Sequence, residues 1–334
     1  MKTKITELFG ITYPIQCGGM LWIATPELAA AISNAGAMGN LTSGNYNTSD
    51  ELRNAIALTR QLTDKPFIVN ITTMPSIRLS AELLKDFFSV CCETRVAAIE
   101  IAGAPVDTFL GKEFIPMAKK AGVKVLHKVG TVKHAIHAQK VGYDAVTVAG
   151  FEEGGFPHKD NISTIILLPK VVEAVNIPVL AAGGMVDGKS MAAALALGAD
   201  GIMMATRFLA TKESAVHPNI YQTLIDKNES DTSLQLQSLL QGFGLQVRAL
   251  RNKIMDQIAD VEKNGGDLSA LLPLISGERA RTVWKDGNAE EAMLTIGQSV
   301  GRIHDIPSVS ELIERMVLEA KEAMIETQKK ILPL

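Results

Sequence analysis

Two adjacent glycines stand directly after a short apolar run late in the chain. Residues 179–182 are Val-Leu-Ala-Ala, and Gly183 and Gly184 follow them. Glycine lets the backbone approach a ligand closely and adopt conformations that are closed to other residues. Ala205 and Thr206 follow the next apolar run, and backbone N–H groups at the ends of two neighbouring parallel strands can bind phosphate. The spacing predicts a phosphate site, although a glycine pair alone also fits an ordinary tight turn.

Residues suited to a flat ring system end two earlier apolar runs. Gly18, Gly19 and Met20 close the first run, where they offer a close backbone approach and an apolar side chain. Asn70 and Thr72 end the third run, and their side chains can hydrogen-bond the edge of a heterocycle. These groups would meet at one rim if the runs form parallel strands.

Lys128 lies near the end of the fifth apolar run. Because side chains alternate along a strand, Leu126 and Lys128 share the face opposite Val125 and His127. A lysine on the inner face of a barrel mouth could stabilise negative charge on a reduced redox cofactor. The alternative is a solvated charge at the rim. Arg207 also has two interpretations: it could contact a phosphate, or it could form an ion pair with a neighbouring helix.

Apolar, β-rich runs alternate with amphipathic segments from the N-terminus to about residue 210. This alternation is typical of a parallel sheet covered by helices. Eight strand–helix units close a barrel, and no early Gly-x-Gly-x-x-Gly motif supports an open dinucleotide-binding sheet. The sequence therefore predicts an α/β fold of the (β/α)8 TIM-barrel class. The expected strands are 14–20, 37–41, 66–72, 97–103, 124–130, 145–150, 178–184 and 201–208.

The alternation stops at about residue 212, where helical patterns continue without intervening strands. Near the C-terminus, Ser308 and Glu311 have the spacing of a capping box, which marks the start of a long amphipathic helix. We expect a barrel built from 1–211 and 300–334, with a small helical insertion domain at 212–299. The helices expected in this part of the chain are 217–227, 233–259, 268–274 and 308–330.

Composition and charge limit the class of protein. Of the 334 residues, 47% are hydrophobic and 21% charged, and the formal net charge is -3. This composition is globular and carries no basic run, so no nucleic-acid partner is expected. The apolar runs have strand length, which predicts no membrane span, and the N-terminus lacks a signal-peptide pattern. The three cysteines form neither a disulfide framework nor a metal-binding spacing, which favours a reducing cytoplasm.

Several motifs together resemble the nitronate monooxygenase (2-nitropropane dioxygenase-like) family. The likeness covers essentially the whole chain. Within the family it is strongest to the branch of bacterial NADH:quinone reductases, and flavin-type enoyl-acyl-carrier-protein reductases share the scaffold. The motifs that carry the resemblance are 14–20, 65–70, 74–75, 126–128, 149–155, 181–184, 205–208, 276–281 and 295–298.

The resemblance implies non-covalently bound FMN, with NADH or NADPH as the reductant. Pro75 matches a loop proline near the active-site mouth and is expected to gate access for nicotinamide or substrate, with an ordinary turn proline as the alternative. The helix faces and the net charge do not determine the oligomeric state, for which a homodimer is one option. On matching positions, the residues expected around FMN are Gly19, Met20, Leu21, Thr72, Lys128, Gly154, Gly155, Ala182, Gly183, Gly184, Ala205 and Thr206.

The chain departs from the family pattern at Phe156, which stands where the family usually has the histidine base of nitronate oxidation. Phenylalanine cannot accept a proton, so it is expected to form an apolar wall beside the flavin. His158 follows two residues later and could replace the base if the loop moved, although Pro157 stiffens that loop. His134 and His137 have helical spacing without an evident third ligand, so no metal site is expected.

Three enzymatic hypotheses and one non-enzymatic hypothesis follow. Hydride transfer from a nicotinamide to FMN needs no protein base, so the first hypothesis is an NAD(P)H:acceptor oxidoreductase with a quinone-like acceptor. In this hypothesis Lys128 and Phe156 shape the site. The second is a nitronate monooxygenase that uses His158 or acts on nitronates that are already ionised, and enoyl-acyl-carrier-protein reduction is the third. A flavin- or phosphate-binding barrel without turnover is the alternative of another class.

Overall fold

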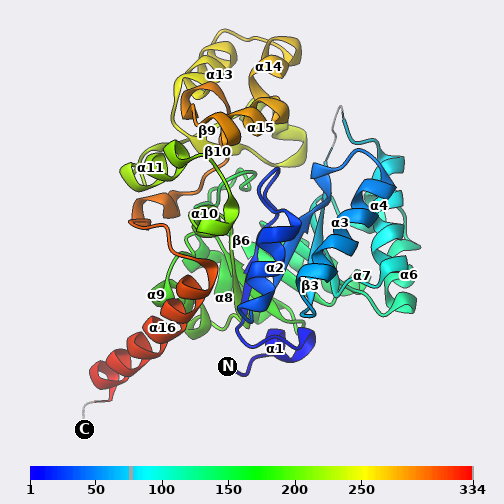
Figure 1. The fold of residues 1–334 in the computed structure, drawn as a ribbon, viewed down its shortest axis with the longest axis vertical. Helices are drawn as coiled ribbons and strands as arrows, with labels where there is room; N and C mark the ends of the chain where they lie inside the picture. Colours follow the sequence, from blue (N-terminus) through cyan, green and yellow to red (C-terminus); the bar gives the residue numbers. More distant parts are fainter. Residues whose placement is uncertain (75–77, 333–334) are drawn as a thin grey trace.

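The computed structural model describes residues 1–74 and 78–332, and its centre is a barrel of eight parallel strands (Figure 1). The hydrogen-bonded order is β1-β8-β7-β6-β5-β4-β3-β2. The two end strands meet where the N–H of Cys17 donates to the carbonyl of Met38 over 2.9 Å, which closes the ring. The expected TIM barrel is confirmed. Its strands are β1 (Ile15–Cys17), β2 (Gly39–Thr42), β3 (Phe67–Thr73), β4 (Ala98–Gly103), β5 (Lys124–Val129), β6 (Ala145–Ala149), β7 (Val179–Ala182) and β8 (Gly201–Met204).

Amphipathic helices surround the barrel and bury its outer face. In α2, for example, Leu28 and Ile32 are fully buried and belong to the same large apolar core as Val125 and Val129 of β5. Burial of apolar area in this layer is the main force that holds the helices to the strands. The covering helices are α2 (Pro26–Asn34), α3 (Ser49–Leu62), α4 (Ala81–Thr94), α6 (Phe114–Ala121), α7 (Val132–Val141), α8 (Thr164–Ala174) and α9 (Gly188–Ala196).

The short helix α1 (Lys4–Phe9) closes the N-terminal end of the barrel. Its Ile5 and Phe9 join a separate apolar cluster with inward side chains of the strands, including Ile68 and Leu126. This end is filled by apolar side chains. A ligand must therefore approach the opposite end, where the parallel strands terminate.

The segment after β8 lies above that opposite end in Figure 1 and differs from its expected structure. The expectation that 233–259 is helical is wrong for most of that range, because β9 (Thr232–Gln235) and β10 (Val247–Leu250) form an antiparallel pair there; its last part, residues 253–259, is helical as expected. Leu236 ends β9 in a left-handed conformation with a φ of 62°. The helices of this segment are α11 (Pro218–Asp226), the short α12 (Gln237–Leu240), α13 (Lys253–Lys263), α14 (Leu268–Ile275) and α15 (Gly277–Asp286).

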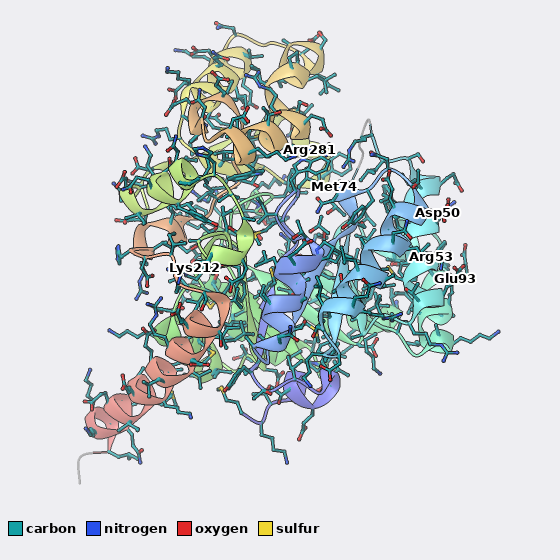
Figure 2. The ribbon with its side chains drawn as sticks, viewed as in Figure 1. Asp50, Arg53, Met74, Glu93, Lys212 and Arg281 are labelled. Carbon is teal, nitrogen blue, oxygen red and sulfur yellow. The ribbon has the colours of Figure 1, made fainter. Side chains whose placement is uncertain are left out.

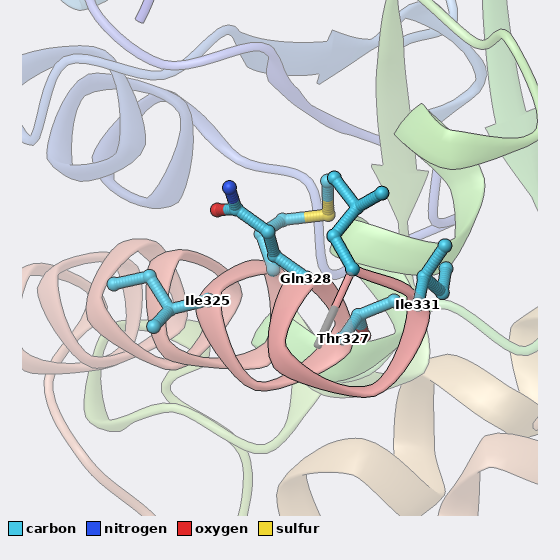
Figure 3. Close-up of a pocket in the computed structure, with 6 residues that line it drawn as sticks. Ile325, Thr327, Gln328 and Ile331 are labelled. Atoms are coloured by element: carbon cyan, nitrogen blue, oxygen red, sulfur yellow. The ribbon is translucent and has the colours of Figure 1, made fainter. Parts of the chain in front are cut away.

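The C-terminal helix α16 (Val309–Ile331) begins at the capping box that the sequence predicts, since Ser308 and Glu311 cap each other. Its first half buries Leu312 and Met316 in the barrel core, and its second half extends away from the body (Figure 1). Among the described helices, none combines the length and apolar character needed to cross a membrane. A shallow hollow on the projecting end, drawn in Figure 3, is lined by Met324, Ile325, Thr327, Gln328, Ile331 and Leu332. This hollow is remote from the strand ends, so it is not the candidate site.

Candidate functional site

The inner face of the barrel changes from apolar at the closed end to polar toward the open end. The pairing register sets Ile68 beside Ala98 in the apolar layer and Asn70 beside Glu100 in the next layer. Both pairs share the inward face because side chains alternate along each strand. The polar layer therefore lies directly below the mouth.

Glu100 is the centre of this polar layer. Its carboxylate is fully buried and accepts hydrogen bonds from the side-chain amides of Gln16, Asn40 and Asn70, over 2.7, 3.1 and 3.0 Å. Burial raises the pKa of Glu100, and the nearby Lys128 and the three amide donors oppose that rise. The sequence reasoning missed Glu100, although alternation along its strand places it on the same face as the other inward residues.

Lys128 lies above this layer at the mouth. Its Nζ donates to Oε2 of Glu153 over 2.8 Å, and only 19% of the lysine side chain and 9% of the glutamate side chain are exposed. The alternative of a solvated rim charge does not describe such a buried ion pair. Lys128 is opposite Ala102 in the register, which in turn is opposite Thr72, so these residues lie at one level.

The loops after β7 and β8 carry backbone donors that have no acceptor in the part of the chain that the structure describes. Gly183 and Gly184 have φ values of 87° and 75°, which only glycine adopts readily. Among the described residues, none accepts a hydrogen bond from the N–H groups of Gly184, Met185 and Ala205. A Cβ on Gly183 would be 2.9 Å from the carbonyl oxygen of Gly150, so a side chain there would collide with the backbone. Unpartnered N–H groups of this kind suit a bound phosphate.

A distant segment joins the loops around these glycines. The N–H of Gly297 donates to Oγ1 of Thr206 over 3.1 Å. A Cβ on Gly154 would be 2.6 Å from the backbone nitrogen of Gly297. The structure therefore brings Gly154, Thr206 and the 295–298 segment together. Ala182 lies beside Ala149 and Met203 in a small inner cluster at the same end of the barrel.

The loop after β1 lies against the polar layer from the other side. A Cβ on Gly19 would be 2.4 Å from Cγ of Asn70, so the glycine backbone rests on that amide. The N–H of Met20 donates to Oγ1 of Thr42 over 3.0 Å, and the Leu21 side chain is exposed. Oγ1 of Thr72 donates to Oδ1 of Asn70 over 3.3 Å. The residues expected at this side of the mouth thus lie close together.

The loop after β6 is fixed to the segment above the barrel. Gly155 and Arg248 exchange two backbone hydrogen bonds, of 3.0 and 2.8 Å. Phe156 is partly buried and packs against the apolar cluster of that segment, which includes Val247 and Ile258. The sequence signal for this pairing is weak because the partners lie far apart in the chain.

His158 lies against α7, beside His134. Its ring is 6.1 Å from that of His134, and its Nδ1 is 3.3 Å from a carboxylate oxygen of Asp160. Burial lowers the pKa of His158, and Asp160 partly opposes this shift. His137 pairs instead with Asp107, and no group of three or more metal-ligating side chains is found within the described ranges.

Two other residues from the sequence reasoning have different outcomes. Arg207 is buried, and its Nη1 lies 3.3 Å from Oδ1 of Asp305, while its Nη2 donates to the Asp305 and Ala210 carbonyl oxygens. Arg207 therefore forms an ion pair, as the second option expects, but its partner Asp305 lies in the segment before the C-terminal helix rather than on a helix. Pro75, the expected gate, lies outside the described residues.

A TIM barrel with paired glycines after β7 and a buried charge cluster below its mouth is typical of enzymes that bind a phosphorylated cofactor. The family model for nitronate monooxygenase matches residues 2–319. The chain belongs to the nitronate monooxygenase family, whose enzymes are flavin-dependent oxidoreductases.

Three known proteins illustrate the range of this similarity. The chain is 33% identical to a (3aS,4S,5R,7aS)-5-hydroxy-7a-methyl-1-oxo-octahydro-1H-indene-4-carboxyl-CoA dehydrogenase of Rhodococcus jostii, over 96% of both chains. It is 29% identical to a probable nitronate monooxygenase of Staphylococcus saprophyticus, over 97% of this chain and 99% of that one. The structure of FabK from Thermotoga maritima has 35% identity and a TM-score of 0.88, with 99% of each chain covered.

Proposed function

We propose that this protein is an FMN-dependent oxidoreductase that takes hydride from NADH or NADPH and delivers it to a small electrophilic acceptor. The observation that carries this proposal is the set of unpartnered N–H groups on Gly184, Met185 and Ala205, together with phenylalanine at position 156. The first feature suits a phosphorylated cofactor. The second removes the proton acceptor that nitronate oxidation uses in the family.

The residues present fit FMN. The donors after β7 and β8 would hold its phosphate, and Gly19 and Met20 would let the ring lie over the polar layer. FMN supplies the hydride-accepting ring when it is bound. The ammonium group of Lys128 would stabilise negative charge that develops on this ring, because Glu153 holds it at the mouth.

The apolar character around Phe156 supports reduction over nitronate oxidation. Hydride transfer needs close stacking and electrostatic support but no protein base. His158, the remaining candidate base, packs against His134 and Asp160. A nitronate monooxygenase reaction through His158 is therefore the weaker alternative.

The acceptor has two candidate classes. A quinone follows from the resemblance to the NADH:quinone reductase branch. An unsaturated acyl thioester is favoured by the similarity to FabK, an enoyl-acyl-carrier-protein reductase, at 35% identity and to a dehydrogenase of a carboxyl-CoA at 33% identity. Both acceptors take up hydride at an electron-poor carbon or oxygen, so the same site chemistry serves either.

Steady-state kinetics tests the proposal. Purified protein is assayed with NADH and NADPH against a series of quinones and 2-enoyl thioesters, and oxygen uptake is measured with nitronates. We expect nicotinamide-dependent turnover with one acceptor class. Nitronate-dependent oxygen uptake that is lost in His158→Ala would favour the monooxygenase, and a flavin that no donor reduces would indicate a binding protein without turnover.

A further inference from the structure

Glu100 carries a buried titratable group that hydride transfer to a flavin does not itself require. The residue is 1% exposed, and side-chain amides from three strands hold its carboxylate. Gln16 donates to Oε1, while Asn40 and Asn70 both donate to Oε2. These neutral donors favour the ionised form. An amide can also serve the protonated form, because it carries an acceptor oxygen beside its donor nitrogen.

The Asn70 amide can turn over without losing a hydrogen bond. Its Nδ2 donates to Oε2 of Glu100 over 3.0 Å, and its Oδ1 accepts from Oγ1 of Thr72 over 3.3 Å. After half a turn, Oδ1 would accept from a protonated Glu100 and Nδ2 would donate to Thr72, because a hydroxyl both donates and accepts. Gln16 and Asn40 would keep their bonds, since the oxygens of a carboxylic acid still accept. The polar layer therefore satisfies Glu100 in either protonation state.

Few charged or titratable groups act on this carboxylate. Lys128, on the neighbouring strand β5, is the cation that does so, and it is already paired with Glu153 at 2.8 Å. Strands β2 and β3 contribute the neutral amides described above. On β1, burial and the charge of Glu100 raise the pKa of the Cys17 thiol, so that the thiol stays neutral. One cation thus serves two carboxylates, and burial raises the pKa of Glu100, the less hydrated of the two.

We propose that Glu100 takes up a proton when the bound flavin is reduced and releases it when the flavin is reoxidised. This inference rests on the proposed function. Hydride transfer brings two electrons and one proton to the ring, and the added negative charge competes with both carboxylates for Lys128. A solvent proton then forms an O–H bond at Glu100, and Asn70 turns over to accept from it. That bond breaks when hydride leaves for the acceptor, and the released proton balances the one that the reduced acceptor takes up.

The pH dependence of the flavin reduction potential tests this inference. FMN-loaded protein is reduced with dithionite in the presence of reference dyes, over a range around neutral pH. A tenfold change in proton concentration shifts a two-electron potential by about 30 mV for each proton taken up. For one proton on the ring and one on Glu100, we expect a slope of about 60 mV per pH unit in the wild type. In Glu100→Gln, which cannot ionise, the slope should fall to about 30 mV per pH unit.

Two other glutamates serve as controls for the position of the proton. Glu93→Gln removes a carboxylate that pairs with Arg53 on the outer surface (Figure 2), and it should keep the wild-type slope. A slope that falls in Glu153→Gln but not in Glu100→Gln would place the proton at the rim and overturn the inference. The inference is also overturned if Glu100→Gln keeps the wild-type slope, or if the wild type already has the lower one.

Infrared difference spectra of the same reduction detect the protonated group directly. We expect the C=O band of a carboxylic acid to appear when the wild type is reduced and to be missing in Glu100→Gln. A wild-type spectrum without this band would contradict proton uptake by the carboxylate, whatever the slope. Chemical reduction needs neither nicotinamide nor acceptor, and turnover with NADH or NADPH is measured separately. The inference can therefore fail while the proposed function stands.

Discussion

Lys128 donates a hydrogen bond to Glu153 over 2.8 Å at the mouth of the barrel, directly above the buried carboxylate of Glu100. One cation is therefore shared by two carboxylates in a poorly hydrated site. The charge that this lysine offers to a bound cofactor depends on how strongly each carboxylate neutralises it. Substitutions at the three positions should separate these effects.

Lys128→Gln should lower the reduction potential of the bound flavin, because the ammonium group stabilises the anionic reduced form. Loss of one charge-assisted interaction of about 1.5–3 kcal/mol corresponds to roughly 30–60 mV for a two-electron couple. Equilibration with a reference dye measures the potential. Glu153→Gln is the matched test: it leaves the lysine less neutralised, so the potential should rise. If the reduction potential shifted in the same direction and by the same amount in both variants, Lys128 would not be the group that stabilises the reduced flavin.

Glu100→Leu should destabilise the protein strongly. The leucine leaves the amide donors of Gln16, Asn40 and Asn70 buried without an acceptor, and each unsatisfied donor costs about 1–3 kcal/mol. Urea unfolding at fixed FMN concentration measures the change. Glu100→Gln keeps the volume and one acceptor oxygen, so its loss should be smaller. A leucine variant as stable as the wild type would show that the polar layer does not depend on this carboxylate.

Stability should fall between pH 6.5 and pH 4 through His127. Burial lowers the pKa of His127 from 6.5 to about 4, so the unfolded chain takes up a proton in this range before the folded one does. His127 therefore contributes stability above pH 6.5 that is lost as the pH falls toward 4, by about 3 kcal/mol in total.

Unfolding free energies of His127→Phe across the same range provide the check. Phenylalanine keeps a ring against Tyr143, whose ring centroid is 5.1 Å from that of His127, although the hydrogen bond to the carbonyl of Gly103 is lost. The variant should be less stable at neutral pH but should lose less stability on acidification. Substitution of the exposed His304 by Gln should leave the pH dependence as in the wild type. A slope unchanged in His127→Phe would rule out this assignment.

Gly183→Ala should weaken FMN binding by about tenfold or more, because a Cβ there meets the backbone and the φ of 87° is strained for alanine. Fluorescence titration of the apoprotein with FMN measures the affinity. Gly10→Ala is the control: its φ is 67° and no atom lies within 4 Å of the added Cβ. It should lose about 1 kcal/mol of stability and keep its FMN affinity. Equal FMN affinity in the two variants would argue against a phosphate site after β7.

The barrel could be predicted from the sequence because each of its strands is a short apolar run and helical patterns separate many of these runs. The same reasoning failed at β9 and β10. The residues of β9 are mostly half-buried. Some backbone hydrogen bonds of β10 go to Gly155, which lies in a loop distant in the chain. Strands paired in this way show little alternation of apolar and polar residues in their own sequence.

The position of Gly183 and Gly184 directly after β7 could be predicted, because the glycine pair follows an apolar run in the sequence itself. The candidate site was not predictable where side chains from separate strands must meet. Glu100 and Gln16 are 84 residues apart, and their hydrogen bond exists only once the barrel has closed.

The visible absorption spectrum of the freshly purified protein, recorded before and after anaerobic addition of NADH and then NADPH, tests the central claim most directly. We expect a yellow protein with a flavin band that one or both nucleotides bleach, and FMN released on denaturation. A colourless protein that FMN cannot reconstitute would contradict the assignment of the loops after β7 and β8 as the site of a flavin phosphate.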